Sequence, residues 1–162
     1  MKKIYNLLNR IEYFILIITF TVMILSTFAQ VINRNFIGLG ISWFEELARY
    51  SMVYMALLAT EIGLRDGSQI SITLLTDMSK GFLKRLLLIA VKIIIIFFSA
   101  VIFITSFQIL RVQIMANQTS AGLRIPMVIP YFALTLNFGI ILVTQSLQLI
   151  RIIFSKNNKE IK

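Results

Sequence analysis

The sequence predicts an all-α membrane protein with four transmembrane helices. Of its 162 residues, 58% are hydrophobic and only 14% are charged, which is too apolar for a soluble domain of this size. Four apolar runs are long enough to cross the hydrocarbon core, for which a helix needs roughly 20 residues. Most lysines and arginines lie at the ends of these runs, where they would meet lipid headgroups. We therefore expect residues 1–162 to form a single four-helix membrane domain.

The residue types that the chain lacks exclude several kinds of chemistry. It contains no cysteine and no histidine, which excludes disulfides, iron–sulfur clusters, histidine-held haem and the usual zinc sites. Ser99 and Lys92 share a helical face but are seven residues apart, roughly 10 Å along a helix, and so do not form a catalytic dyad. The net charge of +9 would suit nucleic acid, but the basic residues flank apolar runs. We expect no enzyme activity, no cofactor, no metal and no nucleic-acid partner.

The predicted spans are residues 13–32, 44–64, 87–110 and 126–150. The basic residues before the first span resemble the start of a signal peptide. Its apolar run is longer than a signal core, however, and Thr27-Phe28-Ala29 is a poor cleavage site, so we expect a retained helix. Pro126 and Pro130 fit the first turn of the last helix, where a missing N–H costs little.

Three connections join the predicted spans. Asn33–Ser42 is a short turn that holds Gly38 and Gly40, and Arg111–Arg124 is the loop before the last span. Asp66–Gly81 has apolar residues near helical spacing, which fits either a short amphipathic helix at the membrane interface or a solvated loop.

The distribution of positive charge predicts the orientation. The N-terminus, the connection between the second and third spans and the C-terminal tail carry most of the lysines and arginines, whereas the two other connections carry only Arg34, Arg111 and Arg124. Positively charged loops stay in the cytoplasm. We expect a multi-pass protein of the bacterial inner membrane with both termini cytoplasmic.

A stripe along the second span predicts a packed surface. At 100° per residue one narrow face collects Glu45, Arg49, Met52, Ala56, Ala59 and Gly63. Small residues allow a neighbouring helix backbone to come close. Trp43, at the start of the span, fits an interfacial anchor.

The charged end of this stripe allows three interpretations. Glu45 or Glu46 can pair with Arg49 inside the helix, at spacings of four and three residues. Alternatively, one member of the cluster reaches across to another helix or chain. The third interpretation is direct proton coupling by one of the carboxylates.

Polar residues also form stripes on the other spans. Lys92, Ser99, Ser106 and Gln113 recur every seven residues in the third span, and Asn137, Thr144 and Gln148 share a face of the fourth. Interhelical hydrogen bonds explain such stripes better than a conduction path, and Lys92 is long enough to snorkel to the cytoplasmic side. Glu61 and Arg65, four residues apart, predict a local salt bridge.

Several of these segments together carry a family resemblance. They are Asn33-Arg34, Trp43-x-Glu45-Glu46-x-x-Arg49, Arg65-x-Gly67-x-x-Ile70, Thr119-x-Ala121-x-Leu123-x-Ile125-Pro126 and Tyr131. With the chain length and the four spans, they resemble the small membrane subunit of tripartite ATP-independent periplasmic (TRAP) transporters. The chain departs from the family at Gln69, where relatives often have histidine, and at Thr60-Glu61, where relatives have a pair of small residues.

The resemblance implies a transporter accessory role. A periplasmic substrate-binding protein would capture an organic acid, such as sialic acid or a C4-dicarboxylate. A large multi-spanning membrane subunit would move it inward, driven by sodium. This chain would brace that subunit through the interface residues Trp43, Glu45, Glu46, Arg49, Ala56, Ala59 and Gly63. The alternative is a stand-alone four-helix proton-coupled exporter that uses Glu46 or Glu61.

Overall fold

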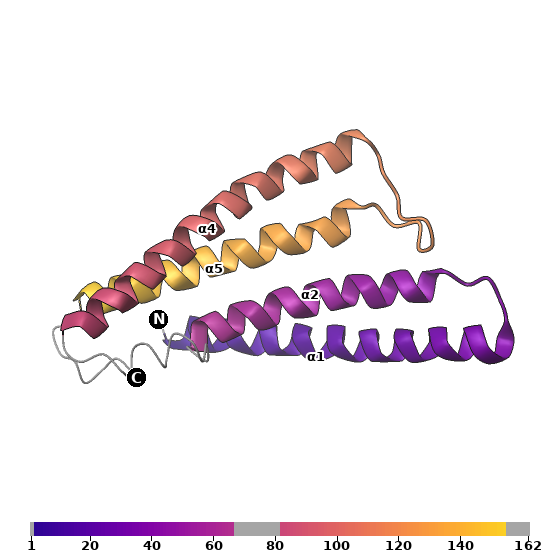
Figure 1. Ribbon diagram of the computed structural model, residues 1–162, viewed down its shortest axis with the longest axis horizontal. Coiled ribbons are helices and arrows are strands. Elements are labelled where there is room, and N and C mark those ends of the chain that lie inside the picture. Colours follow the sequence, from indigo (N-terminus) through magenta and orange to yellow (C-terminus); the bar gives the residue numbers. More distant parts are fainter. Residues whose placement is uncertain (1, 67–81, 155–162) are drawn as a thin grey trace. The chain divides into compact units, whose positions relative to one another are not determined.

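A computed structural model describes residues 2–66 and 82–154 of the chain, and long helices dominate both ranges (Figure 1). They are α1 (Lys2–Ile32), α2 (Trp43–Asp66), α4 (Phe82–Met115) and α5 (Val128–Phe154), and a short π-helix, η1 (Asn33–Ile37), follows α1. The described residues contain no strand, only an isolated bridge between Thr119 and Pro126, which confirms the all-α class. The predicted amphipathic helix falls almost entirely in residues 67–81, outside the described residues.

The first three predicted spans lie within α1, α2 and α4, whereas the fourth, 126–150, starts two residues before α5. The helices extend past most of the other predicted ends. The difference is largest for α1, which begins 11 residues before the predicted span. The helix α4, with 34 residues, extends five residues past each predicted end and includes Lys84, Arg85 and Arg111. These charges set the limits of the predicted span because they are unfavourable in hydrocarbon, but they are compatible with a helix that continues into the headgroup region. At the other end of the chain, Pro130 lies in the first turn of α5 as predicted, but the prediction for Pro126 is wrong, because α5 begins two residues after it.

Three of the described helices are suited to crossing a membrane. By length and composition the spanning segments are Asn9–Ile37, Leu83–Met115 and Val128–Phe154. The helix α2 is long enough, with 24 residues, but it carries charged residues near both ends. Its placement as a fourth transmembrane helix therefore remains a prediction.

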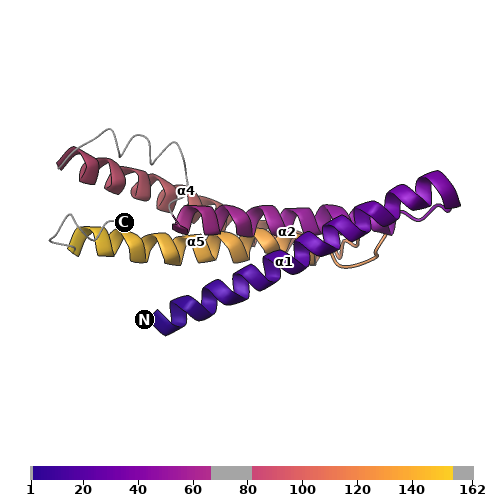
Figure 2. The ribbon, with the colours of Figure 1, turned by 90° about the horizontal axis from the view of Figure 1, so that it is seen from below.

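The chain divides into two compact units, and the first comprises Met1–Ala59 with Ile109–Ala133. Here η1 and Gly38 reverse the chain: Gly38 has a φ of 69° and donates its N–H to the Asn33 carbonyl at 2.7 Å. Asn33 Nδ2 donates to the carbonyl of Leu39 at 2.8 Å. The first part of α2 returns along α1 in Figure 1 and crosses it at an angle in Figure 2. The predicted turn over Asn33–Ser42 is thus built partly from a helical turn.

The second unit comprises Thr60–Gln108 with Leu134–Lys162. Within it α4 and α5 lie side by side, and Thr135 Oγ1 donates to Ser106 Oγ at 2.8 Å. A Cβ added at Gly139 would lie 3.0 Å from Cε2 of Phe103, so the missing side chain makes room for this ring. A small residue and a hydroxyl pair are typical means of bringing membrane helices together.

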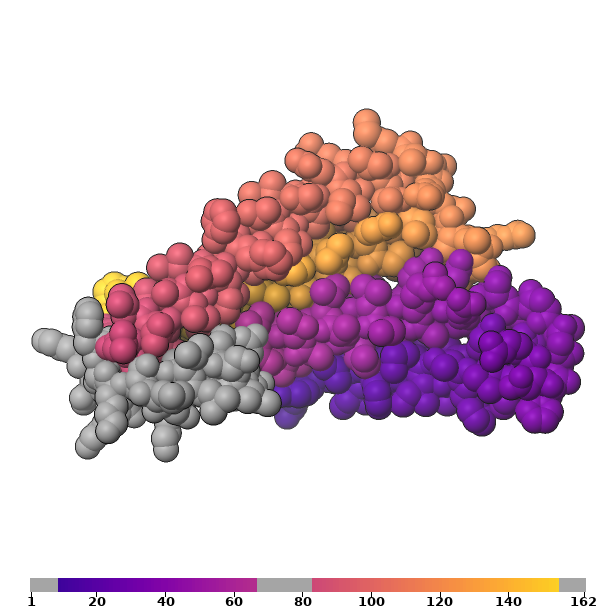
Figure 3. Space-filling view, viewed as in Figure 1, coloured from indigo at the N-terminus to yellow at the C-terminus, as the bar shows by residue number. Residues whose placement is uncertain are grey.

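Polar side chains are buried and large apolar side chains are exposed, the reverse of the distribution in a soluble protein. The largest fully buried side chains are Ile141, Gln145, Glu61, Asn137, Ser99 and Ser106, and all but one of these are polar. Large apolar side chains lie outside, for example Phe97 at 71% and Ile94 at 65% exposure on α4, whose side chains form a continuous ridge in Figure 3. Polar groups turned inward and apolar groups turned outward are expected where the solvent is lipid.

Candidate functional site

The charged start of α2 contains one exposed ion pair. Arg49 Nη2 lies 2.7 Å from Glu45 Oε1, and the two side chains are 65% and 61% exposed. Of the two carboxylates that the sequence offered to Arg49, the structure selects Glu45, four residues earlier. An ion pair this exposed contributes little to stability. Its groups lie on the surface of the chain, where a partner can reach them.

Glu46 has a different role, because it binds the loop between α4 and α5. Its Oε1 accepts the backbone N–H of Gly122 and its Oε2 accepts that of Leu123, both at 2.9 Å. We call this arrangement the Glu46 clamp. Hydrogen bonds to an ionised carboxylate are stronger than neutral ones, so the clamp fixes the loop to the first turn of α2.

The loop itself is folded into a tight hairpin that presents these two N–H groups. Ser120 N–H donates to the Ile125 carbonyl and Met127 N–H donates to that of Gln118, both at 2.9 Å. A Cβ added at Gly122 would lie 3.1 Å from backbone atoms of Trp43. Any larger residue at this position would force the loop or the start of α2 to move by a few tenths of an ångström, so glycine suits this close approach.

The clamp was not predicted from the sequence, because its partners are 76 and 77 residues apart. It joins two segments that carried the family resemblance, Trp43–Arg49 and Thr119–Pro126. Two features of the sequence hint at the clamp. Glu46 is a second glutamate next to Glu45, which can pair with Arg49 by itself, and Gly122 lies in a polar loop.

Glu46→Gln should open the loop without unfolding the helices. The amide keeps the size of the carboxylate but loses its charge and one acceptor oxygen, so both hydrogen bonds weaken or break. Hydrogen exchange followed by mass spectrometry should show the Gly122 and Leu123 amides exchanging at least about tenfold faster. Glu45→Gln is the matched control and should leave these amides unchanged. Unaltered exchange in Glu46→Gln would show that the clamp does not hold the loop.

The helix α2 is two-sided. The predicted interface residues Glu45, Arg49, Ala56 and Ala59 are all exposed, and Met52, on the same face, is 57% exposed. We call these five residues the α2 face. Gly63, the last residue of the predicted stripe, is half-buried, and Trp43 is 40% exposed, with its ring 3.9 Å from that of Phe44.

The opposite side of α2 packs within the chain. Tyr54 donates its hydroxyl to the Ile129 carbonyl at 2.6 Å, and Leu58 is 3% exposed. At 100° per residue, Tyr54 lies about 180° around the helix from Glu45. Within the part of the chain that the structure describes, these contacts lie on one side of α2, and the residues of the α2 face stay exposed.

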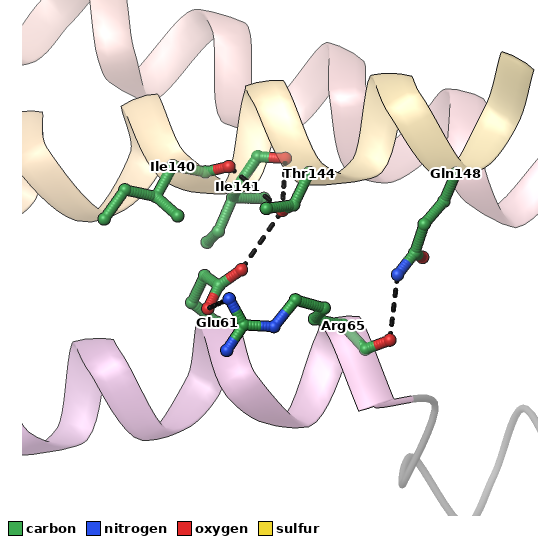
Figure 4. Close-up of polar contacts among 6 residues, drawn as sticks. All are labelled: Glu61, Arg65, Ile140, Ile141, Thr144 and Gln148. Carbon is green, nitrogen blue, oxygen red and sulfur yellow. Dashed lines mark hydrogen bonds and ion pairs between the residues drawn. The ribbon is translucent and has the colours of Figure 1, made fainter. Parts of the chain in front are cut away.

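Further along this packed side, Glu61 and Arg65 form a buried ion pair (Figure 4). Arg65 Nη1 lies 3.3 Å from Glu61 Oε2, and both side chains are fully buried. Thr144 Oγ1 donates to Glu61 Oε1 at 3.1 Å, and Gln148 Nε2 donates to the Arg65 carbonyl at 2.8 Å. The predicted local salt bridge is confirmed. The sequence alone did not show that α5 covers it.

Lys92 is held between α4 and α5. Its Nζ donates to Gln148 Oε1 at 2.6 Å and to Gln145 Oε1. It therefore bonds to α5. The sequence had indicated only that this side chain is long enough to snorkel to the membrane surface. Together with the Thr135–Ser106 and Thr144–Glu61 bonds, these contacts explain part of the polar stripes as interhelical hydrogen bonds, as predicted.

Comparison with known proteins adds a family to this geometry. Residues 23–155 match the family described as "Tripartite ATP-independent periplasmic transporters, DctQ component". The chain is also 27% identical over 101 residues to the isethionate TRAP transporter permease protein DctMQ of Oleidesulfovibrio alaskensis. This match covers 62% of the chain but only 16% of the length of that relative.

Proposed function

Because the chain belongs to the DctQ component family of TRAP transporters, whose members are small non-catalytic membrane subunits, we propose that it braces a large transport subunit through the α2 face. The family resemblance expected from the sequence is confirmed, and so is the expectation that the chain is not an enzyme.

The two-sidedness of α2 carries the proposal. A helix that is packed on one side and exposes small residues on the other is suited to pack against a further helix. The Glu45–Arg49 pair at its exposed end gives that contact a defined position, because charged groups fix register and partner choice at an interface. Trp43 and the Glu46 clamp would hold the end of the helix, and Gly63 would extend the contact.

The membrane topology, the other transporter components and the solute are proposed from the sequence. We propose that α1, α2, α4 and α5 all cross the bacterial inner membrane and that both termini lie in the cytoplasm. A periplasmic substrate-binding protein would deliver an organic acid, and a sodium gradient would drive uptake by the large subunit. The relative from Oleidesulfovibrio alaskensis is named for isethionate, which adds a small sulfonate to the candidate solutes beside sialic acid and C4-dicarboxylates.

The geometry does not favour the alternative of a stand-alone exporter. That mechanism needs a carboxylate free to take up and release a proton. Glu46 is bound by two backbone N–H groups, and Glu61 is bound by Arg65 and Thr144. Both carboxylates are already engaged inside the chain.

Arg49→Ala should lower recovery of the complex and solute uptake together. The measurement is co-purification of the large subunit with the tagged chain, followed by uptake into vesicles that contain both subunits and the binding protein. We expect no uptake by vesicles that contain this chain alone. Reduced uptake with an intact and abundant complex would contradict the bracing role of Arg49, and uptake by the chain alone would contradict the proposed function.

A further inference from the structure

Lys92 carries a positive charge that nothing in the described part of the chain neutralises. Its Nζ bonds only to the neutral amide oxygens of Gln145 and Gln148. Gln148 links Lys92 to Arg65, whose charge is already neutralised by its ion pair with Glu61. An ammonium has three N–H donors, so Lys92 keeps one donor for a further acceptor.

The cluster around Lys92 is also short of acceptors. Gln145 is fully buried and must turn Oε1 towards the ammonium, because both Nζ and Nε2 are donors. Its Nε2 then has no hydrogen-bond partner in the described part of the chain. A group that only accepts hydrogen bonds and carries negative charge would satisfy the charge and the third donor of Lys92, while Gln145 Nε2 stays buried.

The position of Lys92 indicates where such a group comes from. It lies within the apolar segment Leu83–Met115, seven residues past Arg85, or about 10 Å along α4 at 1.5 Å per residue. Its neighbours Ile93 and Ile94 are 53% and 65% exposed, whereas Lys92 is half-buried and accessible in part. Lipid phosphates lie at the membrane surface, so a side chain on a membrane helix is better placed to reach this depth.

We propose that Lys92 is a docking point for an Asp or Glu side chain of the large membrane subunit. This inference rests on the proposed function and adds a contact on α4 to the one on α2. Gln145 and Gln148 hold the ammonium in place from α5, so its position is set before the partner arrives. A preorganised charge loses little conformational entropy on binding.

The test is carbodiimide coupling in the assembled complex, which converts a contacting amine and carboxylate into an amide. Coupling with a membrane-permeant carbodiimide should yield a peptide that joins Lys92 to an acidic residue of the large subunit. Lys92→Arg should abolish this product but keep the complex, because a guanidinium keeps the charge and is not coupled. Lys92→Met should lower recovery of the complex about tenfold or more, equivalent to at least 1.4 kcal/mol of binding energy.

Controls separate this inference from the proposed function. Lys84→Arg removes an amine near the start of α4 and should leave the product unchanged. The thermal unfolding of the isolated Lys92→Met chain shows whether the loss of binding arises from a damaged fold. If the Lys92→Met fold is damaged, two other results still support the contact. They are normal binding by the Lys92→Arg chain and the coupled peptide that joins Lys92 to the large subunit in the wild-type complex.

Three results would overturn the inference while leaving the bracing role standing. They are coupling of Lys92 to Asp77 or Glu160 of the same chain, normal recovery of the Lys92→Met complex, and loss of a bound anionic lipid from that variant in place of a protein contact. Failure of the wild-type chain to co-purify with the large subunit would overturn both proposals.

Discussion

Glu61→Met should lower the free energy of unfolding by about 3–5 kcal/mol, the usual cost of removing one partner from a buried ion pair. The fully buried guanidinium of Arg65 then lacks its counter-charge, and Thr144 loses an acceptor. Few single substitutions in this chain would have so large an effect. Thermal or denaturant unfolding of the chain in detergent measures the change.

The double variant Glu61→Met with Arg65→Met should recover most of this loss. Replacing a whole buried ion pair with apolar residues of similar size is often neutral or stabilising. The matched control is Glu45→Met, which breaks a pair of the same spacing that is 61–65% exposed and should cost about 1 kcal/mol or less. A double variant as unstable as Glu61→Met would show that packing, and not the uncompensated charge, causes the loss.

Joint replacement of Ala56 and Ala59 by Leu should strongly reduce binding of the large subunit. Both residues are exposed in this chain, so the larger side chains fit without internal clashes and the melting temperature should change little. At a close helix contact, each added side chain costs about 1–3 kcal/mol through overpacking. Recovery of the complex should therefore fall about tenfold or more.

The control for this experiment is Ala116→Leu, which makes the same change at an exposed position just past α4. It should leave recovery of the complex unchanged. If the Ala56→Leu, Ala59→Leu chain co-purifies as well as wild type, the α2 face is not the contact surface and the brace must use another side of the chain.

Local patterns in the sequence predicted the helices and the pairs within one helix. The Glu61–Arg65 and Glu45–Arg49 pairs follow from i, i+4 spacing, because a helix fixes this geometry wherever it forms. The stripe of small residues on α2 follows from the same periodicity. Its exposure in the folded chain fits the expectation that it serves a partner, although the partner contact itself stays a prediction.

Contacts between helices could not be predicted in the same way. The Glu46 clamp depends on a loop 76 residues away, and the burial of Glu61 depends on Thr144 and Gln148 of α5. One sequence gives the polar face of each helix but not the rotation and depth at which two helices meet. For the same reason the sequence indicated only that Lys92 is long enough to snorkel and did not indicate that α5 supplies its acceptors.

The Glu46 clamp also limits how the connection between α4 and α5 can change in length. Two successive amides must reach one carboxylate while Gly122 fits against the backbone of Trp43. An inserted residue between Thr119 and Pro126 would shift these amides out of register. At Gly40 a Cβ would meet nothing within 4 Å, although the Ile41 N–H donates to the Leu39 carbonyl across this residue at 2.7 Å. A substitution to alanine is therefore better tolerated at Gly40 than at Gly122.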